Sequence, residues 1–234
     1  MPRIPIIEEL TSGPVPRGSF LVVEFTGASQ WYNASFAIAA GWLKNEGKVI
    51  YLAFAHSPTN IRERLNTLGV NSEQLEREDK LRIGDGYAAT LGQKSKEKYV
   101  LPSLKVTDLS IMYSRDLMRQ RQQLVDWLRI SDNSSTLTRF NDEKSFVELM
   151  LTRTVPTQRM QKLTSIGGFM RGIHSSWVYE QTEAASDGII DFKLDDTADP
   201  PRNLIRIRSM KNVGFDGRWH QLKIDENFDV TLEK

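Results

Sequence analysis

The feature of this sequence that most limits its fold is a repeated alternation of short apolar runs with helix-length segments. The first run, residues 19–25 (SFLVVEF), has strand length and is rich in β-branched residues. Residues 34–43 (ASFAIAAGWL) are apolar almost all round, which suits a helix buried beneath a sheet. A second apolar run follows at 48–54, and Ser57 and Pro58 then supply an N-cap and a first-turn proline for another helix. This order of strand, helix, strand and helix predicts a parallel α/β sheet.

The alternation continues through the second half of the chain. It predicts two further buried strands, at residues 127–132 and 162–166, and two helices, at 143–154 and 175–185. An amphipathic stretch at 114–126 precedes the first of these strands. Toward the C-terminus, apolar and charged residues alternate in 190–194 and 205–208, as in strands with one wet face, and 219–224 is expected to pair with them. We therefore predict an α/β fold with a mostly parallel central sheet and antiparallel hairpin strands at its C-terminal edge.

The length and charge of the chain limit its organisation and its partners. With 234 residues it is long enough for one large domain. Residues 1–18 are rich in proline and glycine, which predicts an N-terminal arm or loop, and residues 19–234 are expected to form a single domain. Lys and Arg total 31 against 30 for Asp and Glu, so the formal net charge of +1 gives no chain-wide basic surface of the kind that indicates nucleic acid.

Composition excludes several kinds of chemistry. The chain has no cysteine, so disulfides, thiolate catalysis and cysteine-bound metal centres are excluded. His56, His174 and His220 lie far apart and lack the spacing that places two imidazoles on one helix face, so we expect no metal site. No apolar run reaches the about 18–20 residues that span a bilayer, and the first ten residues do not follow the pattern of a secretory signal. We therefore expect a cytoplasmic protein with no membrane partner.

Ligands of a parallel α/β sheet bind beyond the carboxyl ends of its strands, so the turn after the first strand is the first candidate site. Residues 27–34 (GASQWYNA) have the length of the phosphate-binding loop G-x-x-x-x-G-K-[ST]. In that loop the glycines let backbone N–H groups approach phosphate, the lysine reaches the β and γ phosphates, and the hydroxyl holds magnesium. Only Gly27 is retained. Tyr32 occupies the second glycine position, Asn33 the lysine position and Ala34 the hydroxyl position.

Five blocks of sequence between residues 14 and 232 carry a resemblance to a known family. They read PVPRGSFLVVEFTG with FAI after it, KVIYLAFAHSPTNI, WLRISDNSSTLTRFNDEKSF, TSIGGFMRGIHSSWVYEQTEAASDGIIDFKL and IRIRSMKNVGFDGRWHQLKI. In this order they resemble the circadian-clock KaiC family of RecA-superfamily ATPases, in its single-domain form. The resemblance implies a RecA-like three-layer αβα fold. It also places Asp132 at the acidic position of the family's magnesium-side strand; the alternative is an exposed turn aspartate that caps the next segment of the chain.

The same resemblance implies that the groups which hydrolyse ATP are altered in this chain. Members that hydrolyse ATP usually carry paired glutamates after the second strand, where this chain has Ala55 and His56. A Lys-Met-Arg element that reaches a neighbouring subunit's nucleotide is replaced by Ser-Met-Lys at residues 209–211. Phosphoryl transfer depends on positioning and on charge neutralisation by Lys, Arg and magnesium. Loss of the loop lysine and hydroxyl is therefore expected to prevent hydrolysis and to weaken nucleotide binding by about two to four decades.

These substitutions define the predicted site. We expect no catalytic residue and no bound cofactor, with weak binding of ATP and magnesium as the alternative. The bulky Trp31 and Tyr32 stand where small residues would let the loop wrap phosphate. The degenerate nucleotide-loop positions, together with the acidic strand end, are Gly27, Ser29, Gln30, Asn33, Ala34 and Asp132. The predicted contacts with another subunit are Trp31, Tyr32, Arg208 and Lys211.

Two histidines have catalytic alternatives. His56, in the glutamate position, has the chemistry of a general base, but without a triphosphate it has nothing to act on, so we interpret it as a polar residue at a strand end. His174 has the alternative of a ligand or sensor role. It precedes Ser175, whose helix-capping context favours a structural role for this segment.

The leading hypothesis is that the chain is not an enzyme. It is then a KaiC-like pseudo-ATPase whose RecA-type core serves as a scaffold for assembly or regulation, as a homo-oligomer or as a hetero-oligomer with an active RecA- or KaiC-like relative. A second hypothesis retains the enzyme as a divergent ATPase, in which Lys48, or Lys211 of a neighbouring subunit, replaces the missing lysine.

A third hypothesis, from another class, is a nucleic-acid-binding accessory protein similar to recombinase paralogues. Single-stranded DNA would then lie on basic side chains while an aromatic ring stacks on a base. The near-zero net charge disfavours this function, and the lysine run lies in residues 86–102, a segment that such a run predicts to be a solvated or mobile loop. The residues that would carry it are Lys94, Lys96, Lys98, Arg139 and Arg171, with Trp31 or Tyr32 as the stacking ring.

Overall fold

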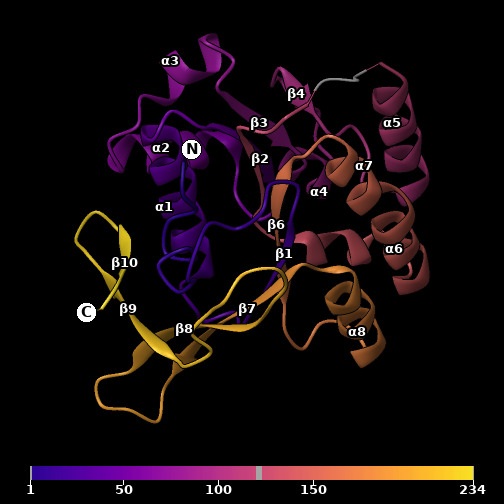
Figure 1. Ribbon diagram of the computed structural model, residues 1–234. Coiled ribbons are helices and arrows are strands. Elements are labelled where there is room, and N and C mark those ends of the chain that lie inside the picture. Colours follow the sequence, from indigo (N-terminus) through magenta and orange to yellow (C-terminus); the bar gives the residue numbers. More distant parts are fainter. Residues whose placement is uncertain (1, 120–122, 234) are drawn as a thin grey trace.

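The computed structural model describes residues 2–119 and 123–233, whose strands form one sheet with helices on both faces (Figure 1). In chain order these strands are β1 (Phe20–Phe25), β2 (Lys48–Ala53), β3 (Leu81–Asp85), β4 (Tyr99–Val100), β5 (Trp127–Ser131), β6 (Thr164–Met170), β7 (Gly188–Asp195), β8 (Arg202–Met210), β9 (His220–Ile224) and β10 (Val230–Leu232). Their order across the sheet is β10-β9-β8-β7-β1-β6-β5-β2-β3-β4. The strands from β7 to β4 pair in parallel, and β8, β9 and β10 extend the sheet through antiparallel pairs.

Helices cover both faces of this sheet. One face is covered by α1 (Trp31–Lys44), α2 (Pro58–Thr67) and α3 (Ser72–Arg77). The other face is covered by α5 (Val106–Arg119), α6 (Glu143–Leu149), α7 (Val155–Met160) and α8 (Ser176–Ala185), as Figure 1 shows. Three short elements complete the chain: α4 (Tyr87–Thr90), the 3₁₀ helix η1 (Ser134–Arg139) and the π-helix η2 (Met150–Thr154). In the described part of the chain, no helix has the length and apolar character needed to cross a bilayer.

The central strand β1 separates two hydrophobic cores. Leu21 and Val23 face the core beneath α1, whereas Phe20 and Val22 face the core beneath α5, α6 and α8. This alternation follows from the two-residue period of a strand, and both sets are apolar because both faces are covered. The all-round apolar character of α1 has the same cause, since that helix contacts the sheet, α2 and the buried residues of the N-terminal segment.

The predicted α/β class, with a mostly parallel sheet and antiparallel strands at its C-terminal end, is confirmed. Ser57 caps α2 as predicted, because its hydroxyl accepts the backbone N–H of Asn60 and Pro58 begins the helix. The strand predicted at 162–166 is wrong in position. The observed strand, β6, begins at Thr164 and ends at Met170. It begins later than predicted because Lys162 adopts φ +52° in the turn before it.

Seven of the described elements have no counterpart in the sequence-based expectations: α3, β3, α4, β4, η1, α7 and β10. The strand β3 carries Arg82 and Gly84 among its five residues, which interrupts its apolar pattern. The segment at 86–102, predicted to be a solvated loop, contains the short α4 and β4. Of the amphipathic stretch predicted at 114–126, residues 114–119 lie in α5 and residues 120–122 lie outside the described residues.

Residues 2–18 form no helix or regular strand, and their isoleucine, leucine and valine side chains are buried. Ile4, Ile7 and Leu10 belong to the same core as α1. A Cβ atom at Gly41 would lie 2.5 Å from the Pro5 ring, so the glycine in α1 allows this segment to contact the helix directly. The segment therefore forms part of the packed structure and covers α1.

Candidate functional site

The loop at 26–30 lies beyond the carboxyl end of β1, where the phosphate-binding loop is expected. It closes on itself, because both the backbone N–H and the hydroxyl of Ser29 donate to the carbonyl oxygen of Thr26, at 2.9 and 2.7 Å. The side-chain amide of Asn33 donates to Gln30 Oε1 at 2.6 Å. Asn33, which stands in the lysine position of the phosphate-binding loop, is therefore hydrogen-bonded within the same segment of the chain.

Trp31 begins α1 and is fully buried. Its indole Nε1 donates a 2.7 Å hydrogen bond to the backbone oxygen of Asp132, and its ring contacts Phe192 edge-on with centroids 5.5 Å apart. A Cβ atom at Gly168 would lie 2.5 Å from Nε1, so this glycine on β6 leaves the space that the indole occupies. Because the ring lies inside the chain, the predicted roles of Trp31 in a subunit contact or in base stacking do not fit this position.

Tyr32 lies across the ends of the neighbouring strands. Its ring makes edge contacts with Phe25 and His56, with centroids 5.3 and 4.8 Å apart, and its hydroxyl accepts from Asn133 Nδ2 at 3.2 Å. Burial, with a smaller contribution from the charge of Asp132, raises the pKa of Tyr32 to about 12. The phenol is therefore neutral at physiological pH and contributes packing and a hydrogen-bonding hydroxyl at this edge of the sheet.

Asp132 lies directly after β5 and has no exposed surface, so the alternative of an exposed turn residue is wrong. Its carboxylate accepts the backbone N–H groups of Phe54, Ala55 and His56, at 2.9, 3.1 and 3.2 Å. His56 Nδ1 lies 3.4 Å from the same carboxylate, which agrees with a polar residue at a strand end. In nucleotide sites magnesium is usually held by one or two carboxylates together with waters and the phosphates of the substrate. The residues present do not fit a magnesium nucleotide, because both oxygens of the acidic group already accept N–H donors and no hydroxyl stands at Ala34.

His174 is held inside the α8 side of the molecule. Its Nε2 lies 2.7 Å from Ser135 Oγ, and its ring stacks on Phe146 with centroids 6.0 Å apart. Burial lowers the pKa of His174, while Glu143 acts in the opposite direction. These contacts fit the predicted structural role.

Sequence reasoning missed a group of charged residues on the α8 side of the sheet. Glu24 on β1 and Asp191 on β7 are nearly fully buried, and arginines surround them. Burial, followed by a hydrogen bond with Glu183, raises the pKa of Glu24. The alternation in β8 predicted a wet face, whereas its arginines reach these buried acids. The ion pairs are Arg171 with Glu24 and Asp191, Arg206 with Asp191, and Arg208 with Glu24, Glu183 and Asp191.

Lys211, a predicted subunit contact, directly follows β8, and its side chain reaches the carboxyl end of α8. Its Nζ donates to the carbonyl oxygens of Ala184 and Ser186, at 3.2 and 2.6 Å, which satisfies the carboxyl end of that helix. Lys48 begins β2, at the opposite end of the strand from the loop at 26–30, and its Nζ lies 5.6 Å from the Trp127 ring. In this chain neither lysine takes the place of the missing loop lysine.

The basic residues of the nucleic-acid hypothesis do not form one patch. Lys94, Lys96 and Lys98 precede β4 at one edge of the sheet, whereas Arg171 follows β6, with three strands between. Arg171 is also paired with buried acids, at 2.7 and 3.0 Å. Arg139 is exposed at the end of η1 and lies over the Phe140 ring.

The sheet order and the helices on both of its faces define a RecA-like αβα fold. The family model "ATPase: KaiC" matches residues 4–232, so the chain belongs to the KaiC ATPase family. A solved KaiC-like protein from the hyperthermophilic archaeon Pyrococcus horikoshii OT3 has the same fold, with a TM-score of 0.75, 14% sequence identity, and coverage of 100% of this chain and 97% of that chain. A comparison of the sequence with curated proteins finds no match.

Proposed function

We propose that this KaiC-family chain is a pseudo-ATPase that acts as a scaffold for assembly or regulation and does not hydrolyse ATP. The observation that carries the proposal is the environment of Asp132. Its carboxylate is fully buried and accepts three backbone N–H groups from the segment after β2. A group held in this way joins β5 to β2 and has no oxygen free for a metal ion.

The loop itself supports the same conclusion. A triphosphate needs a cation against its β and γ oxygens and backbone donors directed toward it. Here Asn33 is bound to Gln30, and the N–H of Ser29 donates within the loop. Trp31 occupies the interior behind the loop, so the loop is held by a core side chain in its present form.

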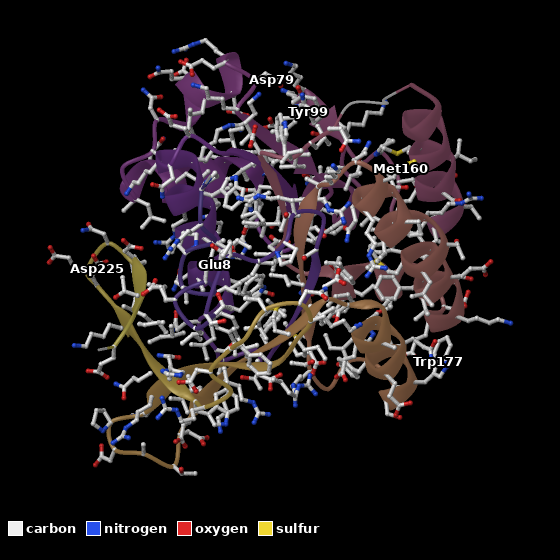
Figure 2. The ribbon with its side chains drawn as sticks, viewed as in Figure 1. Glu8, Asp79, Tyr99, Met160, Trp177 and Asp225 are labelled. Atoms are coloured by element: carbon white, nitrogen blue, oxygen red, sulfur yellow. The ribbon has the colours of Figure 1, made fainter. Side chains whose placement is uncertain are left out.

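We base the proposed scaffold role on the RecA-type fold, which this chain retains. RecA-type cores commonly associate through the face beside the nucleotide, and we propose that this chain associates with copies of itself or with an active relative in the same way. Ile173 and Trp177, in the loop after β6 and the first turn of α8, are 50% and 41% exposed. Trp177 points outward from α8 in Figure 2. Apolar side chains of this size at a protein surface are suited to a contact with another subunit.

Size-exclusion chromatography with light scattering, in the presence and absence of ATP and magnesium, tests the proposal. We expect an assembly larger than one chain, of the same mass in both conditions, and a Trp177→Glu variant that shifts toward the monomer. A matched Met160→Glu variant, exposed on α7 outside this region, is expected to keep the assembly. An assembly that forms only when ATP is added would contradict the proposal, and so would a monomer that does not associate with a KaiC-family ATPase when the two are mixed.

A further inference from the structure

A second site, unrelated to the nucleotide loop, lies between the sheet and the helices on its α5 side. A partly open cavity of about 500 Å³ is lined there by residues of strands β2, β3 and β5 and of α5, η2 and α7. Figure 1 shows α5 and α7 on one side of the sheet. Pockets that bind small molecules have volumes of about 300–1,000 Å³ and mostly apolar walls. The walls here are largely apolar, including Leu52, Leu109, Leu149 and Met150.

One end of the cavity is basic. Ile50 on β2 is in register with Arg82 on β3 and with Arg129 on β5, so the two arginines flank it on the same face of the sheet. Lys98, just before β4, lines the cavity from the sheet edge. Among the described residues that line the cavity there are three cations and no carboxylate. The cavity therefore has an apolar body and a positively charged end.

The three cations differ in whether they are already neutralised. Arg82 is paired with Asp79, whose carboxylate also accepts the hydroxyl of Tyr99 at 2.9 Å, and Figure 2 labels both Asp79 and Tyr99. Arg129 donates to a neutral acceptor, the amide oxygen of Gln158. Lys98 lies over the Tyr99 ring, with its Nζ 5.1 Å from the centroid. Within the described part of the chain neither Arg129 nor Lys98 forms an ion pair. Arg82 and, to a smaller extent, the charge of Lys98 lower the pKa of Asp79, so Arg129 is the cation most available to an anion.

A polar group in the wall supports a ligand at this place. Thr157 on α7 is 4% exposed and lines the cavity, and its hydroxyl has no hydrogen-bond partner among the described residues. Buried hydroxyl groups are normally hydrogen-bonded, because an unpaired one loses its bond to water. A polar atom of a ligand in the cavity would provide the missing partner.

We propose that this cavity binds a small amphiphilic anion, a medium-length apolar chain with a single carboxylate. The carboxylate pairs with Arg129, Lys98 adds positive charge from the sheet edge, and the chain lies along Leu52 and Leu149. A nucleotide does not fit this description, because its several charges would enter a wall that is mainly apolar. The basic row lies in the amino-terminal halves of the strands, whereas the loop at 26–30 follows their carboxyl ends, so this binding is independent of the proposed scaffold function.

Calorimetric titration of the full chain with decanoate and with decanol tests the charged end. We expect decanoate to bind at one site per chain and decanol, which has the same chain without the charge, to bind at least about ten-fold more weakly. Arg129→Gln is expected to weaken decanoate binding by about ten-fold or more and to leave decanol binding unchanged. Equal affinities for the two compounds, or no decanoate binding, would overturn the proposal.

A pair of lysines in one exposed segment provides a matched control. Lys98→Gln is expected to weaken decanoate binding several-fold, whereas Lys96→Gln, two residues away and not part of the wall, leaves it unchanged. Leu52→Trp fills the apolar part and is expected to abolish binding of both compounds. If Leu52→Trp does not fold, the Lys98 and Lys96 pair decides, because neither side chain belongs to the buried core. Decanoate binding that is unchanged in Lys98→Gln and in Arg129→Gln places the compound elsewhere and contradicts the assignment.

Discussion

The indole Nε1 of Trp31 donates a 2.7 Å hydrogen bond to the backbone oxygen of Asp132, which joins the first residue of α1 to the end of β5. In the phosphate-binding arrangement, the corresponding segments present donors to phosphate and an acid to magnesium. In this chain the two segments bind each other through a buried aromatic side chain. This buried contact supports the proposal that the loop at 26–30 does not hold a nucleotide.

Replacing Asp132 tests whether this acid is structural. Asp132→Asn removes the negative charge and exchanges one acceptor oxygen for an NH₂ group that faces backbone N–H donors. We expect the free energy of unfolding to fall by about 2–3 kcal/mol. Urea denaturation measures this change. Asp196→Asn, at an exposed position, is the control and is expected to leave stability unchanged. A stable Asp132→Asn variant would show that the acid is not part of the packing.

Alanine substitutions of two glycines, Gly168 and Gly27, test whether the region around Trp31 is a packed structural region or an open phosphate-binding loop. A Cβ atom at Gly168 would lie 2.5 Å from Trp31 Nε1 and 2.6 Å from the Asp132 oxygen, so Gly168→Ala is expected to cost about 1–3 kcal/mol of stability. A Cβ atom at Gly27 meets nothing within 4 Å, and its φ is not positive. Gly27→Ala is therefore expected to change the free energy of unfolding by less than about 0.5 kcal/mol.

Thermal or urea unfolding of the two variants checks this pair. A large loss of stability in Gly27→Ala, or none in Gly168→Ala, contradicts the described packing around Trp31.

His174 gives the stability of the protein a dependence on pH. Burial holds the pKa of His174 below its usual 6.5 in the folded chain, so the unfolded chain binds a proton first as the pH falls. The contribution to stability is present above about pH 6.5 and is lost as the pH falls toward the folded pKa. The variant His174→Gln should show a smaller loss of unfolding free energy between about pH 7.5 and 5.5 than the natural chain. An equal loss in both proteins would contradict this assignment.

The described arrangement also predicts that single-stranded DNA does not bind through the proposed basic residues. Trp31 is buried, and Arg171 is paired with Glu24 and Asp191. A filter-binding titration across a range of salt concentrations measures this directly, because real phosphate contacts give a steep fall in affinity as salt increases. Tight binding with such a fall would favour the nucleic-acid function over the scaffold.

Much of the fold could be predicted from local patterns. The strands β1 and β2 and the helices α1 and α2 are visible in the sequence because each is a continuous apolar run or has a clear cap, as at Ser57. The strand β3 escaped because Arg82 and Gly84 face the cavity side and break its apolar run. The buried isoleucines near the N-terminus escaped because a proline-rich segment gives no period from which burial can be predicted.

The candidate site could be predicted only in part. The sequence alone places Asn33 and Ala34 in the positions of the lysine and the hydroxyl of the phosphate-binding loop. From these two substitutions we predict weak nucleotide binding and no hydrolysis. The three N–H groups on the Asp132 carboxylate come from a segment about 77 residues earlier in the chain, and backbone donors leave no mark in a sequence. The direction of the Trp31 ring was likewise hidden, because the space it fills is created by Gly168 on another strand.

Calorimetry with ATP and magnesium shows whether the loop at 26–30 binds nucleotide, because it reports binding without requiring turnover. We expect no saturable heat at about 1 mM nucleotide, in the natural chain and in Gly27→Ala alike. Saturable heat in the natural chain that is reduced in Gly27→Ala would contradict this expectation, since that result requires phosphate at the loop.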